Sequence, residues 1–175
     1  NGLRDNAMSK AWSKEDEVWG KIYKEPQKII VLSLGGSLIF PDKIDIGFLK
    51  NFKGVIEKNI KKWHRFVIIC GGGGLARNIQ NAASKITKLS NEDLDWLGIH
   101  TTRLNAQLIK TIFKSNAEDF IMSNPNKKIS FKKNIVIAAG WLPGWSTDYD
   151  AVIIAKNLGI KEVINISNID YVYDK

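Results

Sequence analysis

The sequence is poor in cysteine and histidine, and this scarcity excludes several kinds of site. Its 175 residues include one cysteine, Cys70, and two histidines. A single cysteine cannot form an internal disulfide and is typical of a reducing compartment, so we expect a cytoplasmic protein. Two histidines and one cysteine would need several carboxylates to complete a zinc site, so we expect no structural metal.

Long apolar runs and nucleic-acid motifs are also absent. No apolar stretch approaches the ~18 residues of a membrane helix and no signal peptide is visible, so we expect no membrane partner. The net charge is +8, but the lysines are spread along the chain, and neither an RNP-like aromatic motif nor a helix-turn-helix is present. We therefore expect no nucleic-acid partner, and interpret the charge as a lysine-rich surface that also suits a phosphorylated small molecule.

What remains is the composition of a soluble globular protein, with 44% apolar and 25% charged residues. This length supports one domain with a substantial core. Residues 1–27 are polar and irregular, and we expect them to form an N-terminal extension. The spacing of Trp12, Trp19 and Ile22 suits a short amphipathic helix, and a poorly ordered segment is the alternative.

Both ends of the chain suggest a fragment. It begins with Asn1, although a possible start, Met8, follows, and it stops at Lys175 in what we interpret as a loop after a strand. We therefore expect the C-terminal part of the fold to be missing from this sequence.

Apolar, β-branched runs alternate with segments of helical periodicity. Gly98 lies inside the third predicted helix, where we expect a bend or break. The pattern predicts an α/β layered domain with a mostly parallel sheet. Strands are predicted over 28–34, 66–70, 118–122, 135–139 and 161–166, and helices over about 45–63, 75–85, 91–112 and 148–158.

Glycine-rich stretches follow three of the predicted strands, at 35–36, 71–74 and 140–144. In an open α/β sheet such loops gather at the carboxyl edge, where ligands bind. Glycine lets backbone N–H groups approach a phosphate closely, and Ser146 or Thr147 is placed to cap the helix after the third stretch. The junctions therefore predict a ligand with several phosphates, or two phosphorylated ligands. Ordinary strand-to-helix connections are the alternative.

Other phosphate-binding motifs fit less well. No Gly-x-x-x-x-Gly-Lys-Ser/Thr is present, which excludes a P-loop enzyme. The stretch 71–76 satisfies Gly-x-Gly-x-x-Ala and keeps a dinucleotide-binding oxidoreductase open, but it follows the second strand rather than the first. Arg77, one turn beyond the glycines, would lean over a bound phosphate or lie on the surface. Asp95 would accept a ligand hydroxyl or pair with a lysine.

Taken together, the motifs closely resemble those of archaeal-type uridylate (UMP) kinases, a branch of the amino-acid kinase superfamily. The resemblance covers about residues 28–175, in order and with matching gaps. It rests on Leu34-Gly35-Gly36-Ser37, Gly71-Gly72-Gly73-Gly74-Leu75-Ala76-Arg77, Leu97-Gly98-Ile99-His100-Thr101-Thr102-Arg103-Leu104-Asn105-Ala106, Gly140 to Asp148 with Pro143-Gly144 and Ser146-Thr147-Asp148, and Asn168-Ile169-Asp170 with Val172-Tyr173.

The resemblance implies a three-layer α/β amino-acid kinase fold that contains the UMP-binding half and the start of the ATP-binding half. It implies the reaction ATP + UMP → UDP + ADP with Mg²⁺, in a homo-oligomer that is typically a hexamer. Asp148 and Arg77 would be catalytic. ATP would contact Gly36, Ser37, Gly73, Arg77, Ser167 and Tyr173, and UMP would contact Gly72, Asp95, Trp141, Leu142, Pro143, Gly144, Trp145, Ser146 and Thr147.

Two positions depart from the pattern. Ser33 stands where many superfamily members have lysine, which we interpret as a character of the archaeal branch. Tyr171 replaces the usual glycine of Asp-Gly-Val-Tyr, and a tyrosine at positive φ would strain that loop, which affects the roles of Ser167 and Tyr173. Because the rest of the ATP-binding half is not in the sequence, we expect this chain alone to lack full activity. A different phosphotransferase of the same fold, or a non-catalytic nucleotide-binding relative, is the alternative.

Overall fold

Five parallel strands form the central sheet of the computed structural model, which describes residues 28–168. In space the strands follow the order β3-β4-β2-β1-β5, and every pairing between neighbours is parallel. All five predicted strands are present, so the expectation of a mostly parallel sheet is confirmed. Their bounds are β1 (Ile29–Leu34), β2 (Arg65–Cys70), β3 (Ala117–Met122), β4 (Ile135–Ala138) and β5 (Val163–Ile166).

The helices begin where capping residues stand in the sequence. The Asp45 carboxylate accepts the Phe48 N–H at 2.8 Å, and Ser90 and Asp93 form a reciprocal capping box. A 3₁₀ turn, η1 (Lys114–Asn116), precedes β3. The α-helices are α2 (Gly36–Ile39), α3 (Ile46–Ile60), α4 (Gly73–Ile86), α5 (Asn91–Phe113) and α6 (Thr147–Asn157).

Three details differ from the sequence-based expectation. Gly98 does not break α5, which is continuous; one internal glycine costs a helix only about 1 kcal/mol, and the long helix packs against the sheet. Helix α4 begins at Gly73, two residues earlier than predicted, because its first turn belongs to the glycine junction itself. The four-residue helix α2 was not predicted, since it is too short to show a helical period.

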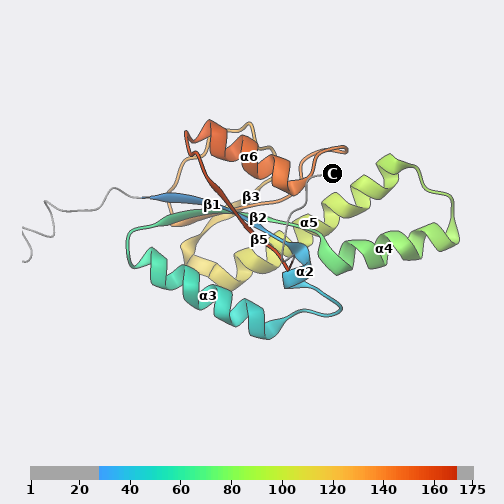
Figure 1. Ribbon diagram of the computed structural model, residues 1–175, viewed down its shortest axis with the longest axis horizontal. Coiled ribbons are helices and arrows are strands. Elements are labelled where there is room, and N and C mark those ends of the chain that lie inside the picture. The colour runs from blue at the N-terminus through green and yellow to red at the C-terminus, as the bar shows by residue number, and fades with distance from the viewer. Residues whose placement is uncertain (1–27, 169–175) are drawn as a thin grey trace, which may run out of the picture.

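Side chains from the two faces of the sheet build two separate cores. Leu32, Leu34 and Ile68 pack on one face with α3 and α5. Val31 and Ile69 point to the other face and pack with α6. The alternation places one helical layer on each side of the sheet, as Figure 1 shows with α6 above and α3 below. The predicted three-layer α/β fold is confirmed.

Helix α4 lies beside the sheet rather than over it, and it packs mainly against α5 and the short α2 (Figure 1). This arrangement places the start of α4 and the first half of α5 next to the carboxyl ends of β1, β2 and β4. None of the helices within residues 28–168 is long and apolar enough to cross a membrane. The expected amphipathic helix at 12–23 and the predicted site residue Tyr173 lie outside the described residues.

Candidate functional site

The first two glycine junctions are in direct backbone contact. A Cβ atom added at Gly36 would collide with the backbone of Gly73, and a Cβ at Gly73 would collide with Gly36. Gly73 also has a φ of +64°, which glycine adopts without strain. The Gly71 N–H donates to Leu34 O at 2.9 Å and joins the ends of β1 and β2. The two junctions thus form one continuous wall of main chain, which we call the glycine wall (residues 35–36 and 71–74).

Arg77 reaches from α4 back across this wall. Its Nη2 donates to the Ser37 hydroxyl at 3.4 Å, so the guanidinium lies between the two glycine junctions. Because a helix start leaves backbone N–H groups without partners inside the helix, an arginine beside it favours an anion such as a phosphate. Arg77 is therefore placed to bind a phosphate between the junctions.

A cleft of about 330 Å³ opens beside the glycine wall. Its walls come from the start of α4, the first half of α5, the end of β4 and the start of α6. Its lining residues are Gly72, Gly73, Ala76, Arg77, Gln80, Asp95, Gly98, Ile99, Thr102, Gly140, Trp145, Ser146 and Thr147.

The third glycine junction forms the opposite wall of the cleft, and we call residues 140–147 the cleft loop. The Gly144 N–H donates to the Asp95 carboxylate at 2.7 Å, and the Gly140 N–H donates to Thr102 Oγ1 at 2.8 Å. Both acceptors lie on α5. Trp145 lines the cleft and packs edge to face between Trp141 and Tyr149, with ring centroids 4.7 Å apart on each side.

Asp148 lies in the first turn of α6, directly after the cleft loop. Its Oδ1 accepts the Ser33 hydroxyl at 2.5 Å and, at 3.4 Å, the Asn165 amide. Ser33 and Asn165 belong to the adjacent strands β1 and β5, so one carboxylate connects the helix to two strands at the carboxyl edge. Ser33 therefore contacts the predicted catalytic aspartate directly.

The structure brings most of the predicted site residues together. Gly36 and Ser37 adjoin Gly73 and Arg77, while Gly72, Asp95, Trp145, Ser146 and Thr147 line the cleft. Ser167 follows β5 beside Gly35, whose N–H donates to Ile166 O. Of the other predicted UMP contacts, Trp141, Leu142, Pro143 and Gly144 belong to the cleft loop but do not line the cleft.

Three polar residues near the cleft did not figure as site residues in the sequence analysis. Thr102 holds Gly140, and the buried Asn105 donates its amide to the carbonyls of Gly71 (2.8 Å) and Gly72 (3.2 Å). Asp150 is 1% exposed and accepts the Trp141 N–H at 3.3 Å. Asp150 lies four residues before the buried Ile154, and this helical spacing was the available signal that its side chain faces inward.

Two acidic groups have pKa values shifted by burial. Burial raises the pKa of Asp150 to about 6, and the hydrogen bond from Trp141 opposes part of this rise. Burial also raises the pKa of the Cys70 thiol, so Cys70 stays protonated and acts as an apolar core residue at the end of β2.

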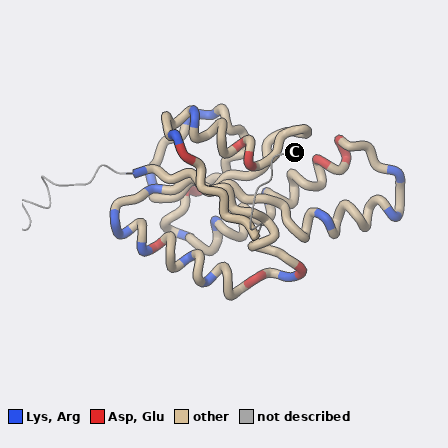
Figure 2. Tube along the Cα trace, in the orientation of Figure 1, with Lys and Arg blue, Asp and Glu red and all other residues tan. Residues whose placement is uncertain are grey.

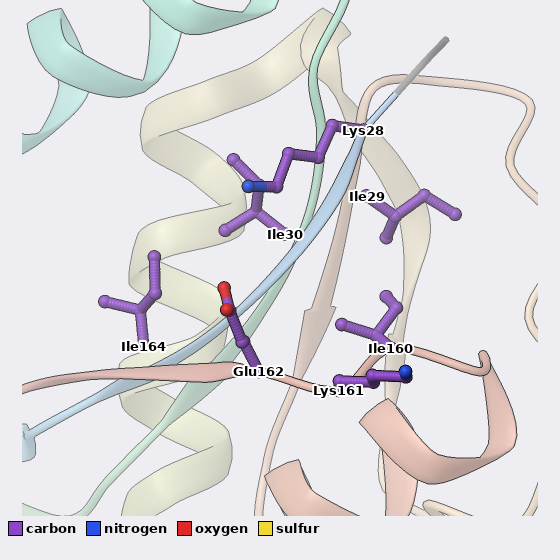
Figure 3. A pocket seen from close by; sticks show the side chains of 7 residues that line it. All are labelled: Lys28, Ile29, Ile30, Ile160, Lys161, Glu162 and Ile164. Atoms are coloured by element: carbon purple, nitrogen blue, oxygen red, sulfur yellow. The ribbon is translucent and has the colours of Figure 1, made fainter.

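A second hollow, of about 320 Å³, lies at the opposite end of β1 and β5. Its lining is mainly aliphatic, with three charged side chains among four isoleucines, and it contains no residue of the glycine junctions (Figure 3). The lining residues are Lys28, Ile29, Ile30, Ile160, Lys161, Glu162 and Ile164. The groups suited to phosphate chemistry are therefore at the carboxyl edge.

The basic residues are distributed over the molecule rather than gathered in one patch. Figure 2 shows Lys and Arg spread over α3, α6 and the connection between α4 and α5.

Comparisons with known proteins agree with this geometry. The model of the amino acid kinase family matches residues 28–175. The chain belongs to the amino acid kinase family. Among the relatives, uridylate kinase of Thermococcus sibiricus is 35% identical over 148 residues, covering 83% of this chain and 64% of the relative. Uridylate kinase of Thermoplasma acidophilum is 31% identical over 153 residues, covering 83% and 62%.

Two solved structures align with this fold. The uridylate kinase structure from Archaeoglobus fulgidus aligns with a TM-score of 0.70 at 28% identity, covering 85% of this chain and 67% of that one. Aspartate kinase from Synechocystis aligns at 0.65 and 13% identity, covering 81% and 28%, and shows the fold alone. These matches confirm the resemblance to archaeal uridylate kinases. The chain spans about 64% of the length of the curated relatives that it matches.

Proposed function

We propose that this amino acid kinase is a nucleoside monophosphate kinase that transfers the γ-phosphoryl group of ATP to UMP, giving UDP and ADP for pyrimidine nucleotide synthesis. The observation that carries the proposal is the cleft between the glycine wall and the cleft loop, with Arg77 reaching from one glycine junction to the other. Such a cleft suits two phosphorylated ligands that meet end to end.

Phosphoryl transfer requires mainly that donor and acceptor lie in line and that the charge on the moving group is stabilised. In our proposal the glycine wall and Ser37 hold the ATP phosphates, together with Ser167 and Tyr173 near the adenosine. Arg77 supplies positive charge between the ligands, and Asp148 orients groups at the site of transfer. The cleft loop, Gly72 and Asp95 bind UMP, with Asp95 accepting a ribose hydroxyl.

Mg²⁺ would enter this reaction with ATP. Within residues 28–168 no group of three or more His, Cys, Asp or Glu side chains could hold a metal ion. Magnesium in kinases is commonly held by substrate phosphates, waters and one or two carboxylates, so a dedicated protein cage is not required. Asp148, which accepts the Ser33 hydroxyl near the carboxyl end of β1, is the carboxylate that we propose would face the ATP phosphates, and the bound Mg²⁺ would neutralise charge on those phosphates.

Calorimetry and a coupled assay test the proposal on the full-length protein. We expect binding of UMP and of MgATP at separate sites, and ADP release that depends on UMP, with weaker responses to CMP and none to small carboxylates or isopentenyl phosphate. Binding of both nucleotides without turnover would support a non-catalytic relative instead. Absence of UMP binding would contradict the proposal.

We also propose that the protein forms a homo-oligomer, as the resemblance implies. Exposed apolar side chains support this: Ile44, Ile46 and Leu104 are 45%, 62% and 59% exposed and border two shallow apolar hollows beside α5. Light scattering after size exclusion should give a multiple of the 19.7 kDa chain mass. Leu104→Glu should reduce this mass, while Val152→Glu on α6 should not, and a monomeric wild type would contradict the proposal.

A further inference from the structure

The backbone of Trp141, at the start of the cleft loop, is held at both of its polar groups. Its N–H donates to Oδ2 of Asp150 on α6 at 3.3 Å, and its carbonyl accepts from Nη2 of Arg103 on α5 at 3.5 Å. These two side chains approach from different helices. Trp141 is therefore the point at which α5 and α6 together determine the path of the loop.

The position of Trp141 affects the wall of the cleft. Its indole ring packs edge to face on that of Trp145, with centroids 4.7 Å apart, and Trp145 lines the cleft. Trp141 itself does not line the cleft, nor does Asp150. A shift of the Trp141 backbone would therefore displace the ring of Trp145 in the cleft, because closely packed side chains transmit such a displacement.

Asp150 is a costly residue to bury. It is 1% exposed, and its second carboxylate oxygen, Oδ1, has no hydrogen-bond partner in the part of the chain that the structure describes. Burial raises its pKa to about 6, so its charged form at neutral pH is destabilising. An apolar side chain of similar size would avoid this cost, which indicates that the contact with Trp141 has a use other than stability.

We propose that Asp150 is a positioning residue for the acceptor side of the cleft: it holds Trp141, and through the ring of Trp145 it sets the surface on which the acceptor nucleotide binds. The role in acceptor binding rests on the proposed function, while the hold on the loop does not. Asp150 does not itself line the cleft, so the effect of its side chain on a ligand is indirect.

Amide hydrogen exchange tests the hold on the loop without any ligand. We expect Asp150→Ala to increase exchange of the amides in residues 140–147 at least tenfold, while amides in β1 and β2 exchange as in the wild type. Asp150→Asn keeps an oxygen acceptor for the Trp141 N–H and should restore slow exchange. Asp42→Ala, which removes an exposed carboxylate, is the control. Unchanged loop exchange in Asp150→Ala would overturn the proposal.

Calorimetry then tests the effect on ligand binding. Because the loop would lose one of its two backbone anchors at Trp141, we expect Asp150→Ala to weaken UMP binding about tenfold, with MgATP affinity unchanged and Asp150→Asn close to wild type. Equal weakening of both nucleotides, or no recovery in Asp150→Asn, would overturn the positioning role. If the wild type binds no UMP, the proposed function fails, and the exchange experiment still decides whether Asp150 holds the loop.

Discussion

The two walls of the cleft are built in different ways. The glycine wall consists of main chain packed on main chain, with Gly36 and Gly73 so close that neither position has room for a side chain. The cleft loop is instead held by side chains of α5 and α6, through Asp95, Thr102 and Asp150. One wall therefore depends on the absence of side chains, and the other depends on particular ones.

This difference determines how each wall can vary. The glycine wall cannot be changed in small steps by substitution, because any side-chain atom added at Gly36 or Gly73 would displace the backbone of the junction. Hydrogen bonds from side chains can be strengthened, weakened or replaced one at a time, so the loop side can be adapted to a different acceptor while the glycine side stays constant.

The largest effect should come from placing a side chain in the glycine wall. Gly36→Val would meet the backbone of residues 71–73, and we expect it to lower the free energy of unfolding by about 3 kcal/mol or more. Gly54, inside α3, has no neighbouring atom within 4 Å of an added Cβ. Gly54→Ala should therefore raise stability by about 0.5–1 kcal/mol in the same urea titration. Equal stabilities for the two variants would contradict the description of this wall.

The next effect concerns the dependence of stability on pH, through Asp150. Its folded-state pKa of about 6 lies above its ordinary value of 3.8, so the folded protein binds more protons than the unfolded chain between these values. Wild-type stability should therefore fall as pH rises from about 4 to 6, and this contribution should level off above pH 7. Asp150→Asn lacks this loss, so the unfolding free energy of Asp150→Asn should rise relative to that of the wild type by roughly 2 kcal/mol between pH 4 and 7.

Asp93 provides a control of opposite sign for the pH experiment. Hydrogen bonds from Ser90 lower the pKa of its carboxylate. The wild type should therefore be more stable than Asp93→Asn at pH 7, and this difference should disappear as pH falls through the lowered pKa. If Asp150→Asn and Asp93→Asn shift in the same direction, the assignment for Asp150 is wrong.

Asp148 tests the contact between the start of α6 and the strands β1 and β5. Asp148→Asn keeps an oxygen for the Ser33 hydroxyl but removes the charge beside the proposed site of transfer. We expect kcat to fall about 100-fold, with a change in unfolding free energy below about 1 kcal/mol. Asp42→Asn, an exposed carboxylate, should leave both quantities unchanged. A parallel loss of activity and stability would make Asp148 a structural residue.

The smallest expected effect concerns Asp95. Asp95→Ala removes the acceptor of the Gly144 N–H and a proposed ligand of the UMP ribose, so the KM for UMP should rise about tenfold with the KM for ATP unchanged. Asp95→Asn retains an acceptor and should lie between the wild type and Asp95→Ala. Glu92→Ala, one turn earlier on α5, is the matched control, and an equal rise there would remove the specific role of Asp95.

Much of the fold was predictable because its signals are local. The strands are short apolar runs, and Asp45, Ser90 and Ser146 accept the backbone N–H groups expected of helix caps. The three glycine junctions were also predictable, since parallel strands present their carboxyl ends at one edge. Helix α2 and the continuity of α5 through Gly98 were not, because packing rather than local preference decides both.

The polar contacts that support the site were harder to predict from the sequence. Asn105 holds Gly71 across 34 positions of the chain, and Thr102 holds Gly140 across 38. Asp150 stands in the first turn of a helix, where an acidic residue is ordinarily explained by the helix dipole. Its burial and its contact with Trp141 distinguish it from the exposed Asp148, two residues earlier.

The sequence by itself determined the order of strands and helices and the positions of the glycine-rich junctions, where the backbone has no side chains to block a ligand. Both signals are local, because helical periodicity, caps and glycine act over a few neighbouring residues. The tertiary structure alone decided which glycine junctions are in contact, and which carboxylates are exposed, buried or hydrogen-bonded to the cleft loop. These depend on contacts between distant residues, whose geometry arises only when the helices pack on the sheet.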